Sequence, residues 1–254
     1  DYRSNVSTLA GSAGIAGNAD GIGMSARFNK PYGLTADSNT LYVTDTYNHT
    51  IRKVIISSGE VTTLAGTAGS TGGSNGTGTL AKFYNPTSVT TDGINLYVTD
   101  QSNQLIRKIA ISSGVVTTLA GTKGISGSTD GVGTAAKFNS PSGITSDGVN
   151  LYVADQWNHL IRKIVISSGD VTTLAGKEGS LGTIDATGTQ AMFNRPYGLT
   201  TDGTNIFVAD TSNHSIRKIE ISSGIVTTLA GLTGTAGKTD GIGTLARFNL
   251  PFNI

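Results

Sequence analysis

One sequence pattern recurs along the chain without insertion or deletion, and its 55-residue period constrains the fold more than any other feature. The tetrad Thr-Leu-Ala-Gly begins at Thr8, Thr63, Thr118, Thr173 and Thr228, each 55 residues after the last. A fixed period of this length is typical of repeat arrays and propellers, in which each unit buries its apolar face against its neighbours. We treat residues 1–254 as one domain, with full repeats at 6–60, 61–115, 116–170 and 171–225 and a partial repeat at 226–254.

Each repeat contains four short stretches with strand character, separated by turn residues. In the first repeat they are residues 33–37, 41–44, 51–56 and 61–64. Four antiparallel strands per repeat are typical of a propeller blade. A helical solenoid is excluded because no apolar stripe follows the 3.6-residue period of a helix. The sequence therefore predicts an all-β propeller with four complete blades and partial blades at both ends. We expect it to be part of a larger ring, or a ring that other copies of the chain complete.

Several strings within the repeats resemble a known family. They are Pro-Tyr-Gly-Leu-Thr (31–35 and 196–200), Leu-Tyr-Val-Ala-Asp (151–155) and Asn-His-x-Ile-Arg-Lys (48–53, 158–163 and 213–218). These strings resemble the NHL repeat, and the glycine-rich linker resembles that of long-linker NHL repeats in bacterial secreted proteins. The resemblance implies a β-propeller, most often with six blades. It implies no single activity, because the family includes binding scaffolds, RNA binders and a few lyases and hydrolases.

Composition excludes several classes of function. The formal net charge is +1 and charged residues make up 14% of the chain, whereas nucleic-acid binders normally show a clustered basic excess. No apolar run approaches the roughly 18 residues of a membrane span. We therefore expect neither a nucleic-acid partner nor a membrane span.

There is no cysteine, which fits a bacterial cell surface or periplasm. We expect an extracellular or cell-surface location, and a chain that begins at Asp1 because a leader was removed or a longer sequence was trimmed.

Two sets of residues that recur in every repeat have structural explanations. The aspartates Asp45, Asp100, Asp155 and Asp210 are each followed by Asn three residues later and Arg seven residues later. Short polar side chains satisfy turn backbone groups, and the arginines lie where they can pair with these carboxylates. The phenylalanines are Phe28, Phe83, Phe138, Phe193 and Phe248, and we expect them to fill gaps between blades. A catalytic set is needed once per ring rather than once per blade.

Metal sites are considered at two further sets of residues. Asp37, Asp92, Asp147 and Asp202 end the first strands, which should line the central channel. A ring of carboxylates could bind Ca²⁺, but an Asx turn before glycine also explains them, and we favour the turn. The histidines His49, His159 and His214 lie in turns of different blades, so we expect no shared metal. No cofactor is expected.

Positions at which the repeats disagree are the most informative about binding. The position of Tyr47 is occupied by Ser102, Trp157 and Ser212 in the later repeats, and the position of Tyr32 by Thr87, Ser142, Tyr197 and Phe252. Exposed aromatic side chains can anchor a protein or sugar, so Tyr47, Trp157, Tyr32 and Tyr197 are our candidate binding residues. No catalytic residue is predicted.

These observations favour a non-catalytic binding or structural scaffold that recognises a protein or carbohydrate. One alternative is a Ca²⁺-dependent lyase or hydrolase on the same fold. Another is a self-assembling extracellular protein whose incomplete terminal blades pair between subunits.

Overall fold

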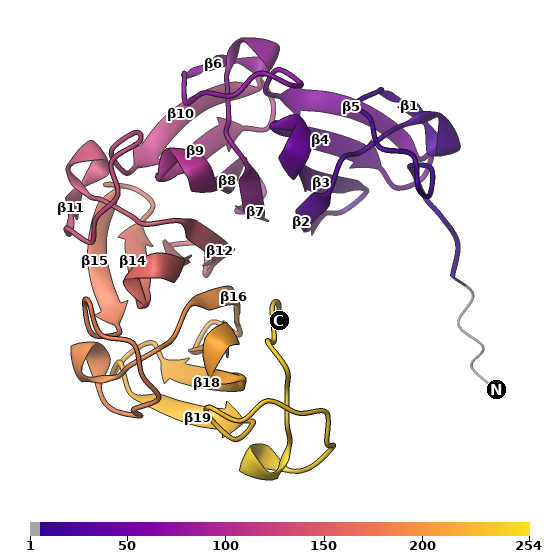
Figure 1. Cartoon of the computed structure of the whole chain (residues 1–254). Helices are drawn as coiled ribbons and strands as arrows, with labels where there is room; N and C mark the ends of the chain where they lie inside the picture. The colour runs from indigo at the N-terminus through magenta and orange to yellow at the C-terminus, as the bar shows by residue number, and fades with distance from the viewer. Residues whose placement is uncertain (1–5) are drawn as a thin grey trace.

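The computed structural model describes residues 6–254 and contains four antiparallel sheets arranged as the blades of a β-propeller (Figure 1). Blade 1 consists of β2 (Pro31–Asp37), β3 (Thr40–Asp45), β4 (Thr50–Ile55) and β5 (Glu60–Ala65). Blade 2 consists of β7 (Pro86–Thr91), β8 (Asn95–Asp100), β9 (Leu105–Ala110) and β10 (Val115–Ala120). Blade 3 consists of β12 (Pro141–Ser146), β13 (Asn150–Asp155), β14 (Leu160–Val165) and β15 (Asp170–Ala175). Blade 4 consists of β16 (Pro196–Thr201), β17 (Asn205–Asp210), β18 (Ser215–Glu220) and β19 (Val226–Ala230).

The first strand of each blade lies at the hub. Strands β2, β7, β12 and β16 contact one another in that order, and the blades fan outward from them in an arc (Figure 1). Figure 1 also shows an open sector between blade 1 and blade 4, with the C-terminal segment beside blade 4. The four predicted blades around a common hub are therefore confirmed.

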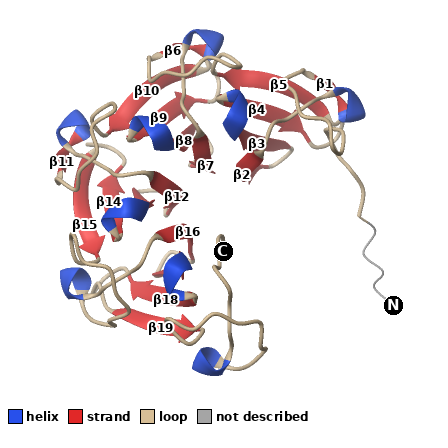
Figure 2. Cartoon of the chain, viewed as in Figure 1, coloured by secondary structure: helices blue, strands red, loops and turns tan. Residues whose placement is uncertain are grey.

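Short helical turns form two sets, which Figure 2 shows as blue coils nearer the hub and at the rim. The inner turns connect the second and third strands of each blade and are η2 (Thr46–Asn48), η4 (Gln101–Asn103), η6 (Gln156–Asn158) and η8 (Thr211–Asn213). The rim turns are η1 (Gly23–Ser25), η3 (Gly78–Leu80), η5 (Gly133–Ala135), η7 (Gly188–Gln190) and η9 (Gly243–Leu245). Within residues 6–254, no helix is long and apolar enough to cross a membrane.

The linkers between blades contain the rim turns. Each rim turn lies just before the Ala-x-Phe segment of the repeat, because a glycine with positive φ, such as Gly133 at 57°, begins the turn. In three blades the linker also adds a two-residue strand to the outer edge, namely β1 (Gly21–Ile22), β6 (Gly76–Thr77) and β11 (Gly131–Val132).

The stretch Val6–Gly11 was expected to form an outer strand, and it does not. It corresponds to β5, whose strand pairing is made with β4 of its own blade, and no such neighbour lies beside it among the described residues. One contact of the repeat is nevertheless kept, because the backbone N–H of Gly11 donates to Gly23 O at 3.0 Å as Gly66 donates to Gly78 at 3.1 Å.

The hydrophobic core is divided among the junctions between blades. At the junction of blades 2 and 3, Phe138 packs with Tyr97 and Ile106 of one blade and with Leu151 and Val153 of the next. Phe83 and Phe193 occupy the corresponding junctions and are fully buried. Phe28 and Phe248 are only half-buried, since each has a blade on one side only. The phenylalanine therefore fills the space between blades wherever two blades meet.

At the hub, the inner strands approach so closely that a side chain has no room at Gly33, Gly143 and Gly198. A Cβ added to Gly143 would lie 2.4 Å from the carbonyl oxygen of Tyr197 in the next blade. In blade 2 the equivalent residue is Ser88, whose hydroxyl accepts a hydrogen bond from Ile144 N at 3.3 Å. This close approach fixes the geometry of the channel.

Candidate functional site

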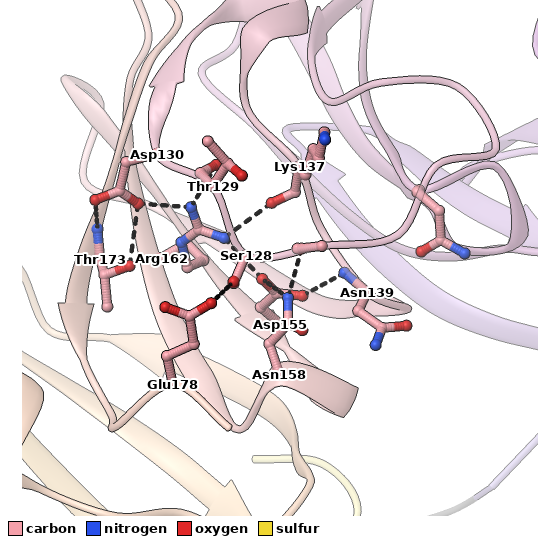
Figure 3. Close-up of polar contacts among 12 residues, drawn as sticks. Ser128, Thr129, Asp130, Lys137, Asn139, Asp155, Asn158, Arg162, Thr173 and Glu178 are labelled. Carbon is pink, nitrogen blue, oxygen red and sulfur yellow. Dashed lines mark hydrogen bonds and ion pairs between the residues drawn. The ribbon is translucent and has the colours of Figure 1, made fainter. Parts of the chain in front are cut away.

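A buried arginine connects the inner turn, the linker and the third strand of each blade (Figure 3). In blade 3, Arg162 donates through Nη1 to Asp155 Oδ2 at 2.8 Å and to the Lys137 carbonyl at 3.0 Å, and through Nη2 to Asp130 Oδ1 at 2.7 Å. Asp155 also accepts hydrogen bonds from Asn158 Nδ2 at 2.8 Å and from the backbone N–H of Asn139 at 2.7 Å. Both charged side chains of the inner pair are fully buried.

The same ion pair recurs in the other blades as Arg52–Asp45, Arg107–Asp100 and Arg217–Asp210. Burial raises the pKa of Asp100, Asp155 and Asp210 to about 6, against the opposing influence of the guanidinium and the hydrogen bonds. In the part of the chain that the structure describes, the Nε atoms of Arg52, Arg107 and Arg162 are buried without a hydrogen-bond partner. Because the Nη atoms bond both the inner aspartate and the linker in every blade, the arrangement holds the linker onto the blade.

His49 and His159 each link one blade to the next, and His214 accepts a hydrogen bond from the backbone N–H of Leu250 in the C-terminal segment at 3.0 Å. His159 Nδ1 accepts a hydrogen bond from the backbone N–H of Arg195 at 3.0 Å, and Gln104 accepts the equivalent bond from Ser140 at 2.6 Å. Burial, followed by the charge of Arg195, lowers the pKa of His159 and keeps it in the neutral form that can accept. Among residues 6–254, no group of three or more His, Asp or Glu side chains is placed to hold a metal ion.

Three of the aspartates at the ends of the inner strands, Asp92, Asp147 and Asp202, accept several hydrogen bonds within their own turns, whereas Asp37, within residues 6–254, accepts only from the Tyr42 hydroxyl at 3.1 Å. Asp147 Oδ1 accepts from the backbone N–H groups of Val149 at 2.8 Å and Asn150 at 2.6 Å, and Oδ2 accepts from Asn150 Nδ2 at 3.1 Å and the Tyr152 hydroxyl at 2.8 Å. Asp92 makes the same set of bonds. This is the geometry of an Asx turn.

Added Ca²⁺ should leave the melting temperature of the protein unchanged, because these carboxylate oxygens already accept donors and each serves a separate turn. Differential scanning calorimetry with and without Ca²⁺ checks this expectation. A rise in melting temperature that depends on Ca²⁺ concentration would contradict the assignment of Asp92, Asp147 and Asp202 to turns.

The Asp147 turn should also contribute stability that depends on pH. Burial alone raises the pKa of Asp147, but the four hydrogen bonds outweigh it and hold the pKa below its ordinary value of 3.8. The ionised form therefore stabilises the folded state above pH 3.8, and this contribution is lost as the pH falls through the folded pKa. Compared with wild type, Asp147→Asn should lose about 1 kcal/mol at neutral pH and progressively less in acid. Urea unfolding across the pH range tests this, and a difference that stays constant in acid would contradict it.

Two of the four candidate aromatic residues meet at the hub. The rings of Tyr197 and Phe252 stack with centroids 3.7 Å apart, and the ring of Tyr32 lies 6.0 Å from that of Phe252. Together with the inner strands they line a cavity of about 110 Å³. Burial raises the pKa of the Tyr197 hydroxyl, and Tyr32 adds to the effect. Tyr32 and Tyr197 therefore belong to the wall of the channel.

The other two candidates, Tyr47 and Trp157, lie on the inner turns η2 and η6, about half exposed. Each is covered by a cation. Lys30 Nζ lies 4.3 Å from the Tyr47 ring centroid, and Arg195 Cζ lies 4.1 Å from that of Trp157. We call the surface formed by the inner turns and by the residues just before the inner strands (Lys30, Asn85, Ser140 and Arg195) the inner-turn face.

Sequence reasoning did not find the two cations. Both occupy the position just before the proline and adopt positive φ, 49° for Lys30 and 53° for Arg195. The signal that could have found them is that this position, like that of Tyr47, differs from repeat to repeat. The structure thus brings Tyr32 and Tyr197 to the hub and leaves Tyr47 and Trp157 on separate inner turns.

One apolar cavity lies on the open flank of the first blade. It has a volume of about 270 Å³ and is lined by Phe28, Leu34, Leu41, Val43 and neighbouring residues on the open flank of blade 1. Leu34 is 65% exposed, whereas its equivalent Ile144 is 5% exposed. In blades 2, 3 and 4 the corresponding flank packs against the preceding blade.

The fold and the repeated ion pair define the class of protein: a repeat β-propeller. Residues 28–54 match the family model described as NHL repeat. The chain therefore contains an NHL repeat within a β-propeller, as its sequence motifs predict.

Two curated relatives are similar over most of the chain. The Arabidopsis thaliana protein SUPPRESSOR OF QUENCHING 1, chloroplastic, is 32% identical over 251 residues, covering 91% of this chain and 23% of that protein. NHL repeat-containing protein 2 of Homo sapiens is 28% identical over 303 residues, covering 84% of this chain and 42% of that protein. The chain therefore spans less than half the length of either relative.

Solved structures from Bacteroides share the fold. An auxiliary nutrient binding protein from Bacteroides ovatus aligns with a TM-score of 0.60 and 19% identity, covering 80% of this chain and 49% of that one. A protein of unknown function from Bacteroides thetaiotaomicron aligns with a TM-score of 0.53 and 22% identity, covering 97% of this chain and 69% of that one. At these identities the likeness concerns the fold alone.

Proposed function

We propose that this chain is a non-catalytic binding scaffold that holds a macromolecular partner on its inner-turn face. The observation that carries the proposal is the placement of Tyr47 and Trp157. They stand at one position of the repeat, half exposed, where the other two blades have Ser102 and Ser212. Packing therefore does not require an aromatic side chain there, and large exposed aromatic residues are typical anchors of interfaces.

The chemistry of the repeated residues supports binding rather than catalysis. The buried arginines and aspartates hold each linker onto its blade, and His49 and His159 join consecutive blades. Tyr47 and Trp157, at a position that differs among the blades, are therefore free to bind a partner, and the blades hold them rigidly. Preorganised side chains lose little entropy on binding.

A displayed peptide library provides the test. Clones selected on the wild-type protein are screened against Tyr47→Ser/Trp157→Ser, a variant that takes its residues from the chain's own second and fourth blades and so should keep the fold. We expect most enriched clones to lose binding to the variant. Clones that bind wild type and variant equally, or a library that yields no clone, would overturn the proposal.

We include an extracellular or cell-surface location in the same proposal, supported by the absence of cysteine. Immunoblotting of fractionated source cells should find the protein outside the cytosol, and a purely cytosolic signal would contradict this part.

A further inference from the structure

We infer that the inner-turn face binds an acidic peptide segment, whose carboxylates pair with Lys30 and Arg195 while its apolar atoms pack on Tyr47 and Trp157. This inference rests on the proposed function and adds the chemistry of the partner. It follows from how the two cations are held, from the distribution of charge over the molecule and from the spacing of the cation–aromatic pairs.

The two cations are held in place without being neutralised. Within the described part of the chain, neither Lys30 nor Arg195 forms an ion pair with a carboxylate, whereas the buried Arg162 pairs with both Asp155 and Asp130. The rings of Tyr47 and Trp157 attract the cations through their negative faces. An aromatic ring carries no net charge, so the full positive charge remains available to an external anion.

Charges of both signs are spread over the molecule, and the inner-turn face has a further cation nearby. The Lys123 side chain lies against the linker at Gly73, and the Asn103 side chain of η4 lies near the same glycine. Glu178 of the next linker accepts a hydrogen bond from the Ser128 hydroxyl. At the other end of the first strands stand Asp37, Asp92, Asp147 and Asp202, and the third strands carry Lys53, Lys108, Lys163 and Lys218. The cations of the inner-turn face therefore attract an acidic segment locally.

A peptide fits this face better than a nucleic acid. Nucleic-acid sites follow the phosphate backbone with a continuous basic stripe. Here the two cation–aromatic pairs belong to blade 1 and to the junction of blades 3 and 4, and Ser102 separates them on the inner turn of blade 2. A segment with carboxylates at intervals matches two separated positive points.

The single tryptophan of the chain, Trp157, makes the test specific to this site. Its fluorescence is followed during titration with oligoglutamate, oligolysine and oligouridylate. We expect oligoglutamate alone to change the emission in a saturable way. The apparent affinity should fall at least tenfold between about 0.01 and about 1 M salt, where the Debye length shrinks from about 30 to about 3 Å.

Matched charge variants complete the experiment. Lys30→Glu/Arg195→Glu should weaken oligoglutamate binding at least tenfold. Lys108→Glu/Lys163→Glu, the same change of charge on β9 and β14, should leave it within twofold. Melting curves confirm that both variants are folded. Equal weakening in both variants, a response to oligolysine equal to that to oligoglutamate, or binding of oligouridylate instead would overturn the inference.

The inference and the proposed function fail in different ways. If library clones depend on Tyr47 and Trp157 but are not acidic, and oligoglutamate leaves the emission unchanged, the binding face stands and its acidic partner is wrong. If no clone depends on those two residues, the binding face itself is wrong.

Discussion

Replacing Asp155 with alanine should lower the free energy of unfolding by about 3–5 kcal/mol, because the change leaves a buried guanidinium without its partner. Arg162 is fully buried and would retain two backbone carbonyls and, as a carboxylate partner, Asp130, whose side chain is 49% exposed. Asn158 Nδ2 and the backbone N–H of Asn139 would lose their acceptors as well. Urea denaturation followed by circular dichroism measures the loss.

The neighbouring carboxylate provides a matched control. Asp130→Asn introduces the residue that blade 2 has at this position, Asn75, which still accepts a hydrogen bond from Arg107 at 3.0 Å. Because Asp130 is half exposed, its charge is screened by solvent and the cost should be below about 1 kcal/mol. Equal losses in the two variants would show that the inner ion pair has no special role in holding the blade.

Truncating Phe138 to alanine should cost about 3–5 kcal/mol, the range for removing a large buried aromatic side chain. The ring is fully buried between blades 2 and 3, and the Arg162 guanidinium lies 5.2 Å from its centroid. The substitution therefore opens a cavity at a junction and removes a cation–π contact. Thermal melting and denaturant titration measure the effect.

Phe248 occupies the same position of the repeat and serves as the control for Phe138. It is only half-buried, with blade 4 on one side. Phe248→Ala should therefore cost clearly less than Phe138→Ala. An unchanged melt for Phe138→Ala, or equal losses in the two variants, would remove the assignment of the phenylalanine as the filler between blades.

The parts of the fold that recur every 55 residues could be predicted from the sequence. The Asp-x-x-Asn turn and the arginine seven residues after its aspartate indicate the ion pair, since both residues lie at the same end of adjacent strands. Val153 on β13 faces Arg162 on β14 in the observed register. Because the Asp-x-x-Asn pattern and its arginine recur in four blades, the same ion pair is predicted four times, and it is found in all four.

The inner-turn face could be predicted only in part. The variation at the position of Tyr47 marked that residue and Trp157, but the stacking of Arg195 on Trp157 joins side chains from two blades. It depends on the positive φ of the residue before the proline. Glycine and asparagine are the residues that usually indicate a positive φ, and Lys30 and Arg195 are neither. Phe252 likewise meets Tyr32 only because the hub brings distant repeats together.

The absence of cysteine permits a direct test of the central claim, that equivalent residues are rotated about one axis. Spin labels are attached in pairs to cysteines introduced at the exposed turn residues Ser57, Ser112, Ser167 and Ser222, and their separations are measured by pulsed electron paramagnetic resonance. Neighbouring pairs should give one common distance, and the separation of positions 57 and 222 should be far less than three times that distance, as for chords of an arc. Separations that grow in proportion to the number of repeats, as in a straight array, would contradict the account.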